Sequence, residues 1–477
     1  MLQHAAAESW NGMTIATKET EKLPSGPAVI PPGFYRELIR LAFPIALQSF
    51  LLAAVSASDT MMLVRLSQNA MSAVSLASHV QFVQNMLLMV ITGAGMILGA
   101  QYYGKGDAEA IKALKNIMLR LGAATSVLFF LLCMLMPRSI MDIFTNQEEL
   151  IQIGARYLRF AAFSYLLTGI SQVYLTMMKI NRRPGRSARI SAIAVVLNIA
   201  LNYALIFGLG PIPALGVPGA AISTATARVV ELGLAILLSP REGELKQRLG
   251  QLKSRSSTLS RDFVRVSLPL LGGLFVWGLG FTVYSVITGH MGKEVAAAAA
   301  VANVVRDLMC CTCEGTSAAA GIMVGNQLGA GNLALGKAYG ERLLRISLVI
   351  GLISCVLVLA VLPPARRLSM LSDEAVGHLD KMLIIISVYM IARSANGIVI
   401  NGIFASGGDT VFNMYSLATC MWGIAIPLSA LGAFVFNWPV WLVYACTCLD
   451  EVGKIPWVLA HYKKYQWVRN LTRETLY

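Results

Sequence analysis

Residues 343–362 read LLRISLVIGLISCVLVLAVL, an apolar run with a single charged side chain. A helix needs roughly 20 mainly apolar residues to cross the hydrocarbon layer of a membrane, so this stretch predicts a membrane-spanning helix. Comparable runs recur from about residue 37 to residue 460, separated by short polar stretches. A closed β-barrel also satisfies the backbone in lipid, but its strands show only weak alternation of apolar and polar residues. The long runs favour helices.

The composition of the whole chain agrees with this interpretation. Only 13% of its 477 residues are charged and 56% are hydrophobic, whereas soluble proteins carry about 25% charged residues. We therefore predict an all-α polytopic membrane protein with twelve transmembrane helices. The predicted spans lie near 37–62, 70–99, 117–137, 151–178, 188–208, 217–238, 263–289, 295–325, 343–362, 378–405, 413–436 and 438–460.

The net charge of +14 follows the pattern of a membrane topology. With the N-terminus inside, 27 of the 39 Lys and Arg fall in the N-terminus, the loops after even spans and the tail, against 8 in loops after odd spans. This imbalance fits the positive-inside rule and predicts a plasma or inner membrane protein with both termini in the cytoplasm. Membrane lipid is the expected surrounding, and no nucleic acid partner is expected. The first 33 residues lack the apolar core of a signal peptide.

The two halves of the chain repeat each other at an offset of about 225 residues. RLAFP at 40–44 precedes one apolar run, and RVSLP at 265–269 precedes another. The segment around Gln101, followed by a glycine turn, matches the segment around Gln327. Each repeat holds six spans, an even number, so both copies start on the same membrane face as parallel repeats. We predict two pseudo-symmetric six-helix lobes.

The predicted domains follow from this duplication. The polar stretch 239–262 is expected to be either an amphipathic surface helix or a plain charged linker. The glycines near Gln101 and Gln327 are expected to end helices and turn the chain, because no strand and no Gly-Lys-Ser/Thr makes them a phosphate loop. The predicted parts are a flexible cytoplasmic leader 1–33, an N-lobe 34–238, the linker 239–262, a C-lobe 263–460 and a basic cytoplasmic tail 461–477.

From about residue 36 to the C-terminus, the sequence resembles the multidrug and toxic compound extrusion (MATE) family, in its prokaryotic form. Asp59 follows Pro44 by fifteen residues in the first span, and the segments around Gln101 and Gln327 also match. Four further stretches carry the resemblance, namely NIALNYALIFG at 198–208, LGVPGAA at 215–221, GIFASGGDT at 402–410 and KKYQWVRNL at 463–471.

The resemblance implies two six-helix lobes that export amphipathic, often cationic, small molecules, driven by entry of H⁺ or Na⁺ and without another cofactor. Asp59 falls on the family's carboxylate of the first span, and Asn198 on its asparagine of the fifth. Asn202 stands where some branches have Asp and others Asn. Another branch carries a Glu where this chain has Trp277. This chain therefore has the complete coupling residues of neither branch, and the sequence does not decide whether H⁺ or Na⁺ is the coupling ion.

Ionisable groups inside spans are functional candidates because each costs roughly 2.5–3.5 kcal/mol at the membrane centre. Some have opposite charges at helical spacing and are expected to stabilise packing: Arg228 with Glu231, and Asp450 and Glu451 with Lys454. Asp59 has no such neighbour before it. At about 1.5 Å per residue it lies roughly 27 Å from the cytoplasmic edge, so it is either a coupling carboxyl that takes up a proton or Na⁺ beside Asn198 and Asn202, or an interfacial Asp.

The second half has its own candidates. Asp307 and Glu314 are seven residues apart on one helix face, which suggests an acidic stripe. Asp307 has an alternative role, pairing with Arg393 or Arg306, so Glu314 is the stronger functional candidate. The aromatic residues that include Trp277 and Tyr284 either line a cavity for flat cations or belong to the ordinary core. The loop residues Gly408 and Asp409 join Gln101 and Gln327 as candidate hinge positions.

The function that these features favour is a secondary antiporter for multidrug efflux, acting as a monomer by alternating access between two lobes. A lipid-linked oligosaccharide or lipid flippase of the same superfamily is the alternative, and it needs a larger cationic cavity. An intramembrane enzyme is less favoured, because it needs clustered His, Asp and Glu residues. The five histidines stand singly, so neither an enzyme nor a metal site is expected.

Overall fold

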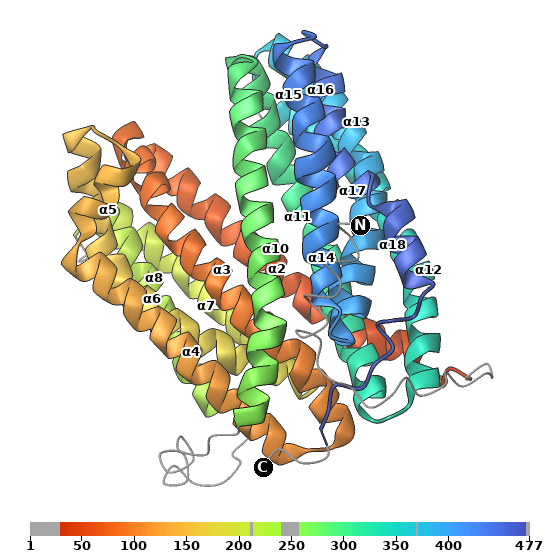
Figure 1. Cartoon of the computed structure of the whole chain (residues 1–477). Coiled ribbons are helices and arrows are strands. Elements are labelled where there is room, and N and C mark those ends of the chain that lie inside the picture. Colours follow the sequence, from red (N-terminus) through yellow and green to blue (C-terminus); the bar gives the residue numbers. More distant parts are fainter. Residues whose placement is uncertain (1–28, 210–212, 240–256, 369–370, 474–477) are drawn as a thin grey trace. The chain divides into compact units, whose positions relative to one another are not determined.

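The computed structural model describes residues 29–209, 213–239, 257–368 and 371–473. Helices joined by short connections make up these residues (Figure 1). Eleven of the helices are long and apolar enough to cross a membrane, which confirms an all-α polytopic membrane protein. The predicted leader 1–33 and linker 239–262 lie largely outside the described residues.

The helices of the first half match the first six predicted spans, with ends that differ from the predicted ones by up to nine residues. A short helix, α5, is added to them. They are α2 (Phe34–Leu66), α3 (Gln68–Lys105), α4 (Ala108–Leu135), α5 (Pro137–Phe144), α6 (Glu148–Ile180), α7 (Pro184–Phe207) and α8 (Val217–Leu237).

The second half contains the same kind of long helices, but several are interrupted. Two stretches, η1 and η2, are π-helical, a form that often marks functional sites. The elements are α10 (Ser257–His290), α11 (Lys293–Gly329), α12 (Leu333–Leu368), α13 (Asp373–Asn396), η1 (Gly397–Phe404), α14 (Thr410–Leu417), η2 (Ala418–Ala425), α15 (Ile426–Phe434), α16 (Val440–Thr447), α17 (Leu449–Val452) and α18 (Ile455–Tyr462).

The predicted span 438–460 is the one that the structure corrects. In place of one continuous helix it forms α16, α17 and α18 in succession. Gly453 separates the last two and has a low helix propensity, and Pro456 in the first turn of α18 has no N–H to continue the preceding helix. A hydrophobic run alone does not reveal such breaks. The twelfth predicted span is therefore a broken helix.

The helices form two compact units, which we call the N-unit (residues 47–99 and 108–260) and the C-unit (residues up to 46, 100–107 and 261–475). Three helices contribute residues to both units, namely α2, α3 and α10, whose first four residues belong to the N-unit. In α2 the boundary follows Ala46, two residues after Pro44, whose missing N–H removes one hydrogen bond from the helix. The last turns of α3, from Ala100, belong to the C-unit.

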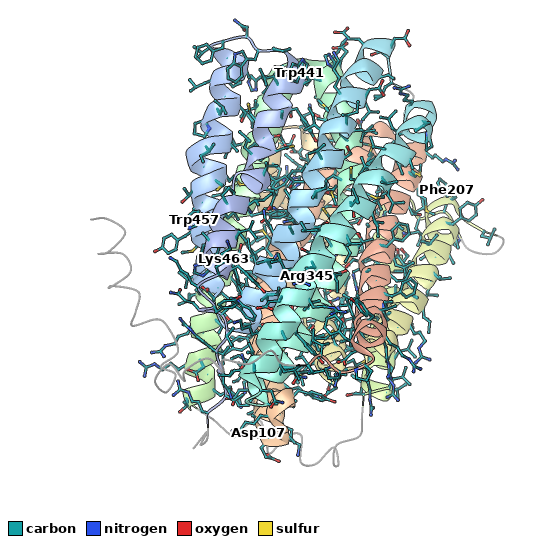
Figure 2. The ribbon with its side chains drawn as sticks, turned by 90° about the vertical axis from the view of Figure 1, so that its right-hand side faces the viewer. Asp107, Phe207, Arg345, Trp441, Trp457 and Lys463 are labelled. Atoms are coloured by element: carbon teal, nitrogen blue, oxygen red, sulfur yellow. The ribbon has the colours of Figure 1, made fainter. Side chains whose placement is uncertain are left out.

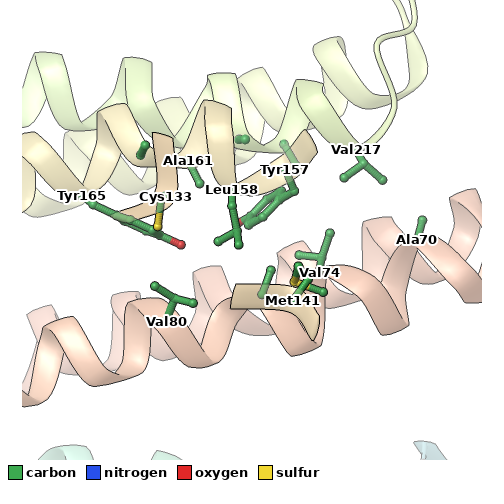
Figure 3. Packing of buried hydrophobic residues seen from close by; sticks show 14 of the residues in the cluster. Ala70, Val74, Val80, Cys133, Met141, Tyr157, Leu158, Ala161, Tyr165 and Val217 are labelled. Carbon is green, nitrogen blue, oxygen red and sulfur yellow. The ribbon is translucent and has the colours of Figure 1, made fainter. Parts of the chain in front are cut away.

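The N-unit is built around α6, which packs against α4 on one side and α8 on the other. Small residues allow the close approach of α4 and α6. A Cβ on Gly169 would collide with the carbonyl of Gly122 and the hydroxyl of Ser126, and the Gly169 N–H donates to that hydroxyl at 3.1 Å. Closer to the N-terminus of α6 than Gly169, Leu158 and Tyr165 pack against side chains of α3 and α5 (Figure 3).

The C-unit is built around α11, which contacts α12, α13 and η1. The Ser317 hydroxyl of α11 donates to the Gly397 carbonyl at 2.8 Å, where α13 passes into η1. This bond takes up a carbonyl at a point where the hydrogen-bond pattern of the helix changes. The contact therefore joins the unit's central helix to its π-helical stretch.

Candidate functional site

A chain of polar side chains connects α2, α7 and α8 inside the N-unit. The amide nitrogen of Asn202 donates to Asp59 Oδ1 at 2.5 Å and contacts Asn198 Oδ1 at 3.3 Å. The Ser223 hydroxyl donates to Asn202 Oδ1. Asn198 donates in turn to the Thr224 hydroxyl at 3.2 Å. Asp59, Asn198 and Asn202, which the sequence singled out, therefore form one hydrogen-bonded group.

Local sequence explains why these groups meet. Asn198 and Asn202 are four residues apart, so they share a face of α7. Gly219 lies four residues before Ser223 on α8, and a Cβ there would stand only 2.5 Å from the Leu205 carbonyl oxygen of α7. A larger residue would push the two helices apart. The glycine thus permits the approach that brings Ser223 onto Asn202, a signal that the sequence alone does not display.

The group gives the Asp59 carboxyl one hydrogen-bond donor, the Asn202 amide. Asn202 and Asn198 are buried, and Asp59 is partly buried. The Asn202 amide N–H₂ points toward Asp59 and its oxygen points toward Ser223. Among the described residues nothing is hydrogen-bonded to Asp59 Oδ2. That oxygen is the place where this carboxyl can take a proton or contact a hard cation without losing its bond to Asn202.

A second polar group lies eleven residues away along both α2 and α7, about 16 Å at the rise of a helix. Here Gln48 of α2 donates to Ser191 of α7 at 2.8 Å. Glu231 of α8 accepts from Ser171 at 3.2 Å and pairs with Arg228 at 2.6 Å. The predicted Arg228–Glu231 pair is confirmed. Sequence reasoning missed Gln48 because it considered only ionisable residues inside spans. An uncharged polar residue inside a span is also a candidate functional residue.

The second-half candidates do not come together in one site. Asp307 is exposed and pairs with its chain neighbour Arg306 at 3.0 Å, one of the two partners that the sequence suggested. Glu314 is exposed. Trp277 and Tyr284 both contact Phe281, at ring distances of 4.9 and 5.8 Å.

Arg393 belongs to a buried ionic cluster that the sequence did not reveal. Its Nη1 lies 3.0 Å from Glu451 Oε1. Lys454 lies 3.0 Å from Glu451 Oε2, and Asn396 donates to the same oxygen at 2.7 Å. The predicted Glu451–Lys454 pair is thus confirmed, but it forms part of a cluster that joins α13, α17 and the turn before α18. Local spacing identified one partner and could not identify the others.

Asp450 behaves differently from its neighbour. We expected it to pair with Lys454, and this is wrong. Asp450 is 3% exposed, and no described residue hydrogen-bonds its Oδ1. It lines a pocket with Arg306 and Tyr284, whose hydroxyl also lacks a described partner. Irregular helices in membranes are tolerated where they line a cavity, and the break of the twelfth span beside Asp450 fits that rule.

Three of the four candidate hinge residues hold the C-terminal tail. The Gln101 amide donates to the Ser406 and Arg469 carbonyls at 2.6 and 3.1 Å, and its oxygen accepts from the Leu471 N–H at 2.6 Å. Gly408 has φ +78° and lies against Leu471. Asp409 lies 2.6 Å from His461. Gln327 instead contacts Asn332 at 3.4 Å, within its own turn.

A model of the MatE family matches residues 44–204 and 269–431, one stretch in each half of the chain. The chain belongs to the MatE family. It is therefore a membrane transporter of the multidrug and toxic compound extrusion type, and these proteins are not enzymes.

Relatives and solved structures agree with the family. A probable multidrug resistance protein NorM from Thermotoga maritima is 25% identical over 405 residues, 83% of this chain and 85% of its own. An uncharacterised transporter, YisQ, from Bacillus subtilis is 22% identical over 406 residues, 83% of this chain and 86% of its own. The fold resembles the MATE transporter VcmN from Vibrio cholerae, with a TM-score of 0.83, 16% identity and coverage of 92% of this chain and 98% of VcmN.

Proposed function

We propose that this MATE protein is a monomeric secondary antiporter of the cell membrane that exports amphipathic, cationic organic compounds in exchange for H⁺ or Na⁺. The observation that carries the proposal is Asp59, held by Asn202 on one oxygen and left without a described partner on the other. Several relatives are named as probable multidrug resistance proteins, which supports an organic substrate.

The hydrogen-bonded group gives Asp59 two states. The ionised carboxylate accepts from Asn202, which is fixed in turn by Ser223 and Asn198. A proton on Oδ2, or Na⁺ contacting it, removes the carboxylate's negative charge while this frame stays in place. Exchange follows when the neutral and charged states favour different lobe arrangements, since a ligand shifts an equilibrium only by its differential affinity. Asp59 then releases the outgoing cation as it takes up the incoming ion.

The alternative, a flippase for lipid-linked oligosaccharides, requires a cationic cavity for phosphate groups. Three cations lie away from the ends of the predicted spans of the second half, and each has an acidic partner among the described residues. Arg393 and Lys454 contact Glu451, and Arg306 contacts Asp307. Cations already paired with carboxylates do not form a phosphate site. The charge pattern therefore favours efflux of cations.

Transport in proteoliposomes tests the proposal. Efflux of a lipophilic cation such as tetraphenylphosphonium is measured under a proton gradient and, separately, under a sodium gradient. Asp59→Asn is expected to reduce driven efflux under the coupling gradient by roughly 5–150-fold, the range of typical coupling energies. Glu314→Gln and Asp307→Asn, both at exposed carboxyls, are the matched controls and are expected to keep most activity.

Two results would overturn the proposal. Wild-type protein that moves no cation under either gradient would remove the antiporter function. Loss of transport in Glu314→Gln together with full activity in Asp59→Asn would move coupling to the second half.

A further inference from the structure

A groove on the C-unit lies between the first turns of α2 and residues 342–350 in the first half of α12. Its α2 side carries Tyr35, Ile39 and Ala42, and its α12 side carries Arg342, Arg345 and Val349. The lining contains two cations and no acid, and its other residues are Thr316 and aliphatic side chains. Ile39 is 65% exposed. The groove therefore presents an apolar surface with positive charge on one helix.

The position of the charge along the helix coincides with the edge of the membrane. Arg345 is the last charged residue before the uncharged stretch 346–365 of α12, which ends at Arg366. At about 1.5 Å per residue this stretch spans roughly 30 Å, the thickness of the hydrocarbon layer. On α2, Arg40 likewise precedes the uncharged stretch 41–58. The two arginines of the groove thus lie at the level of lipid headgroups.

The guanidinium groups at this level are available to a ligand. Arg342 donates from Nε to the Tyr35 hydroxyl at 2.9 Å and lies over the Tyr35 ring at 5.1 Å, which fixes its direction and leaves its Nη donors. Arg345 is exposed, and no described residue forms an ion pair with it (Figure 2 labels it on α12). Glu341, the acid nearest in sequence, accepts from the Tyr465 hydroxyl at 3.1 Å.

We propose that this groove binds one anionic phospholipid, with its phosphate between Arg342 and Arg345 and an acyl chain along Ile39, Ala42 and Val349. Planar guanidinium groups bind phosphate through paired hydrogen bonds, and basic pockets between membrane helices bind acidic headgroups. The apolar part continues from the headgroup level into the hydrocarbon layer, as a lipid chain does. The site does not depend on the transported substrate.

The duplication provides a matched control. Positions 225 residues before Arg342 and Arg345 are Ile117 and Arg120, so only the second half carries both arginines. Arg120 is exposed on α4, as Arg345 is on α12. A general attraction of basic residues to acidic membranes would involve Arg120 and Arg345 equally. A specific lipid site would depend on Arg342 and Arg345 and not on Arg120.

Native mass spectrometry and thermal melting of the delipidated full chain in a neutral detergent measure the binding. We expect dioleoyl phosphatidylglycerol to bind at least about tenfold more tightly than dioleoyl phosphatidylcholine, since hydrogen bonds to charged groups contribute about 1.5–3 kcal/mol. Arg342→Gln/Arg345→Gln is expected to lose this preference and Arg120→Gln to keep it. Arg342→Lys/Arg345→Lys should retain part of it and serves if the double Gln variant does not fold.

A second variant tests the acyl part of the groove. Val349→Trp fills the apolar end without touching the arginines and should weaken both lipids. Equal binding of the two lipids by wild type, or an unchanged preference in the double Gln variant, would overturn the proposal. So would full competition by glycerol phosphate, because that result would show a headgroup anion site with no part for the acyl chain.

Discussion

Replacing Glu451 by Gln tests whether the buried ionic cluster of the C-unit holds α13 and the broken twelfth span together. Glu451 is 3% exposed and accepts from Arg393 at 3.0 Å, Lys454 at 3.0 Å and Asn396 at 2.7 Å. Gln is nearly the same size, so packing is preserved. It carries no charge, however, and its amide nitrogen cannot accept. The change leaves two cations without their shared carboxylate.

The expected cost is large because one of the two cations, Lys454, cannot reach water. The Lys454 side chain is only 3% exposed. Removing one partner of a buried ion pair costs about 3–5 kcal/mol, since an uncompensated charge stays buried. We therefore expect an apparent melting temperature lower by about 10 °C. Glu451→Gln/Arg393→Gln should recover part of the loss, because one of the two unpaired cations is then absent.

Thermal melting of purified protein, followed by aggregation or by thiol labelling of buried cysteines, measures the effect. Glu148→Gln is the matched control. Glu148 pairs with Arg138 at 2.6 Å, but both side chains are more than half exposed, and such surface pairs contribute about 0–1 kcal/mol. If Glu451→Gln melts within a degree or two of Glu148→Gln, the cluster does not stabilise the unit and the reasoning is refuted.

Three further changes have expected outcomes. Gly219→Ala should lower stability by about 1–3 kcal/mol through overpacking against α7. Gly233→Ala on the same helix meets no atom within 4 Å and should raise stability by up to about 1 kcal/mol. The two variants should therefore shift the melting temperature in opposite directions, and equal shifts would contradict this. Gln101→Ala should speed tryptic release of the C-terminal tail, while Gln327→Ala should not; equal cleavage would refute the clamp. Trp467→Ala should cost about 3–5 kcal/mol, measured by melting, because the ring is completely buried; an unchanged melting temperature would contradict its packing role.

Much of the N-unit site was within reach of the sequence. The resemblance pointed to Asp59, Asn198 and Asn202, and helical spacing placed the two asparagines on one face. The hydrogen bonds to Asp59 and Ser223 depend on how closely α2 and α8 approach α7, and spacing along one helix contains no such information. Gly219 decides that approach, yet one glycine among 41 does not reveal its partner in a sequence.

The sequence by itself determined that this chain is a helical membrane protein whose two halves repeat each other. Burying unbonded backbone groups or charges in lipid costs free energy, so every membrane span must be a long apolar run with few charges. It also determined the local pairs Arg228–Glu231 and Glu451–Lys454, since residues three positions apart in a helical segment are neighbours in any fold. Only the tertiary structure decided that Glu451 also binds Arg393, that Asp450 faces a pocket and that Gln101 holds the tail. These contacts join residues 58 or more positions apart, and helix packing alone brings them together.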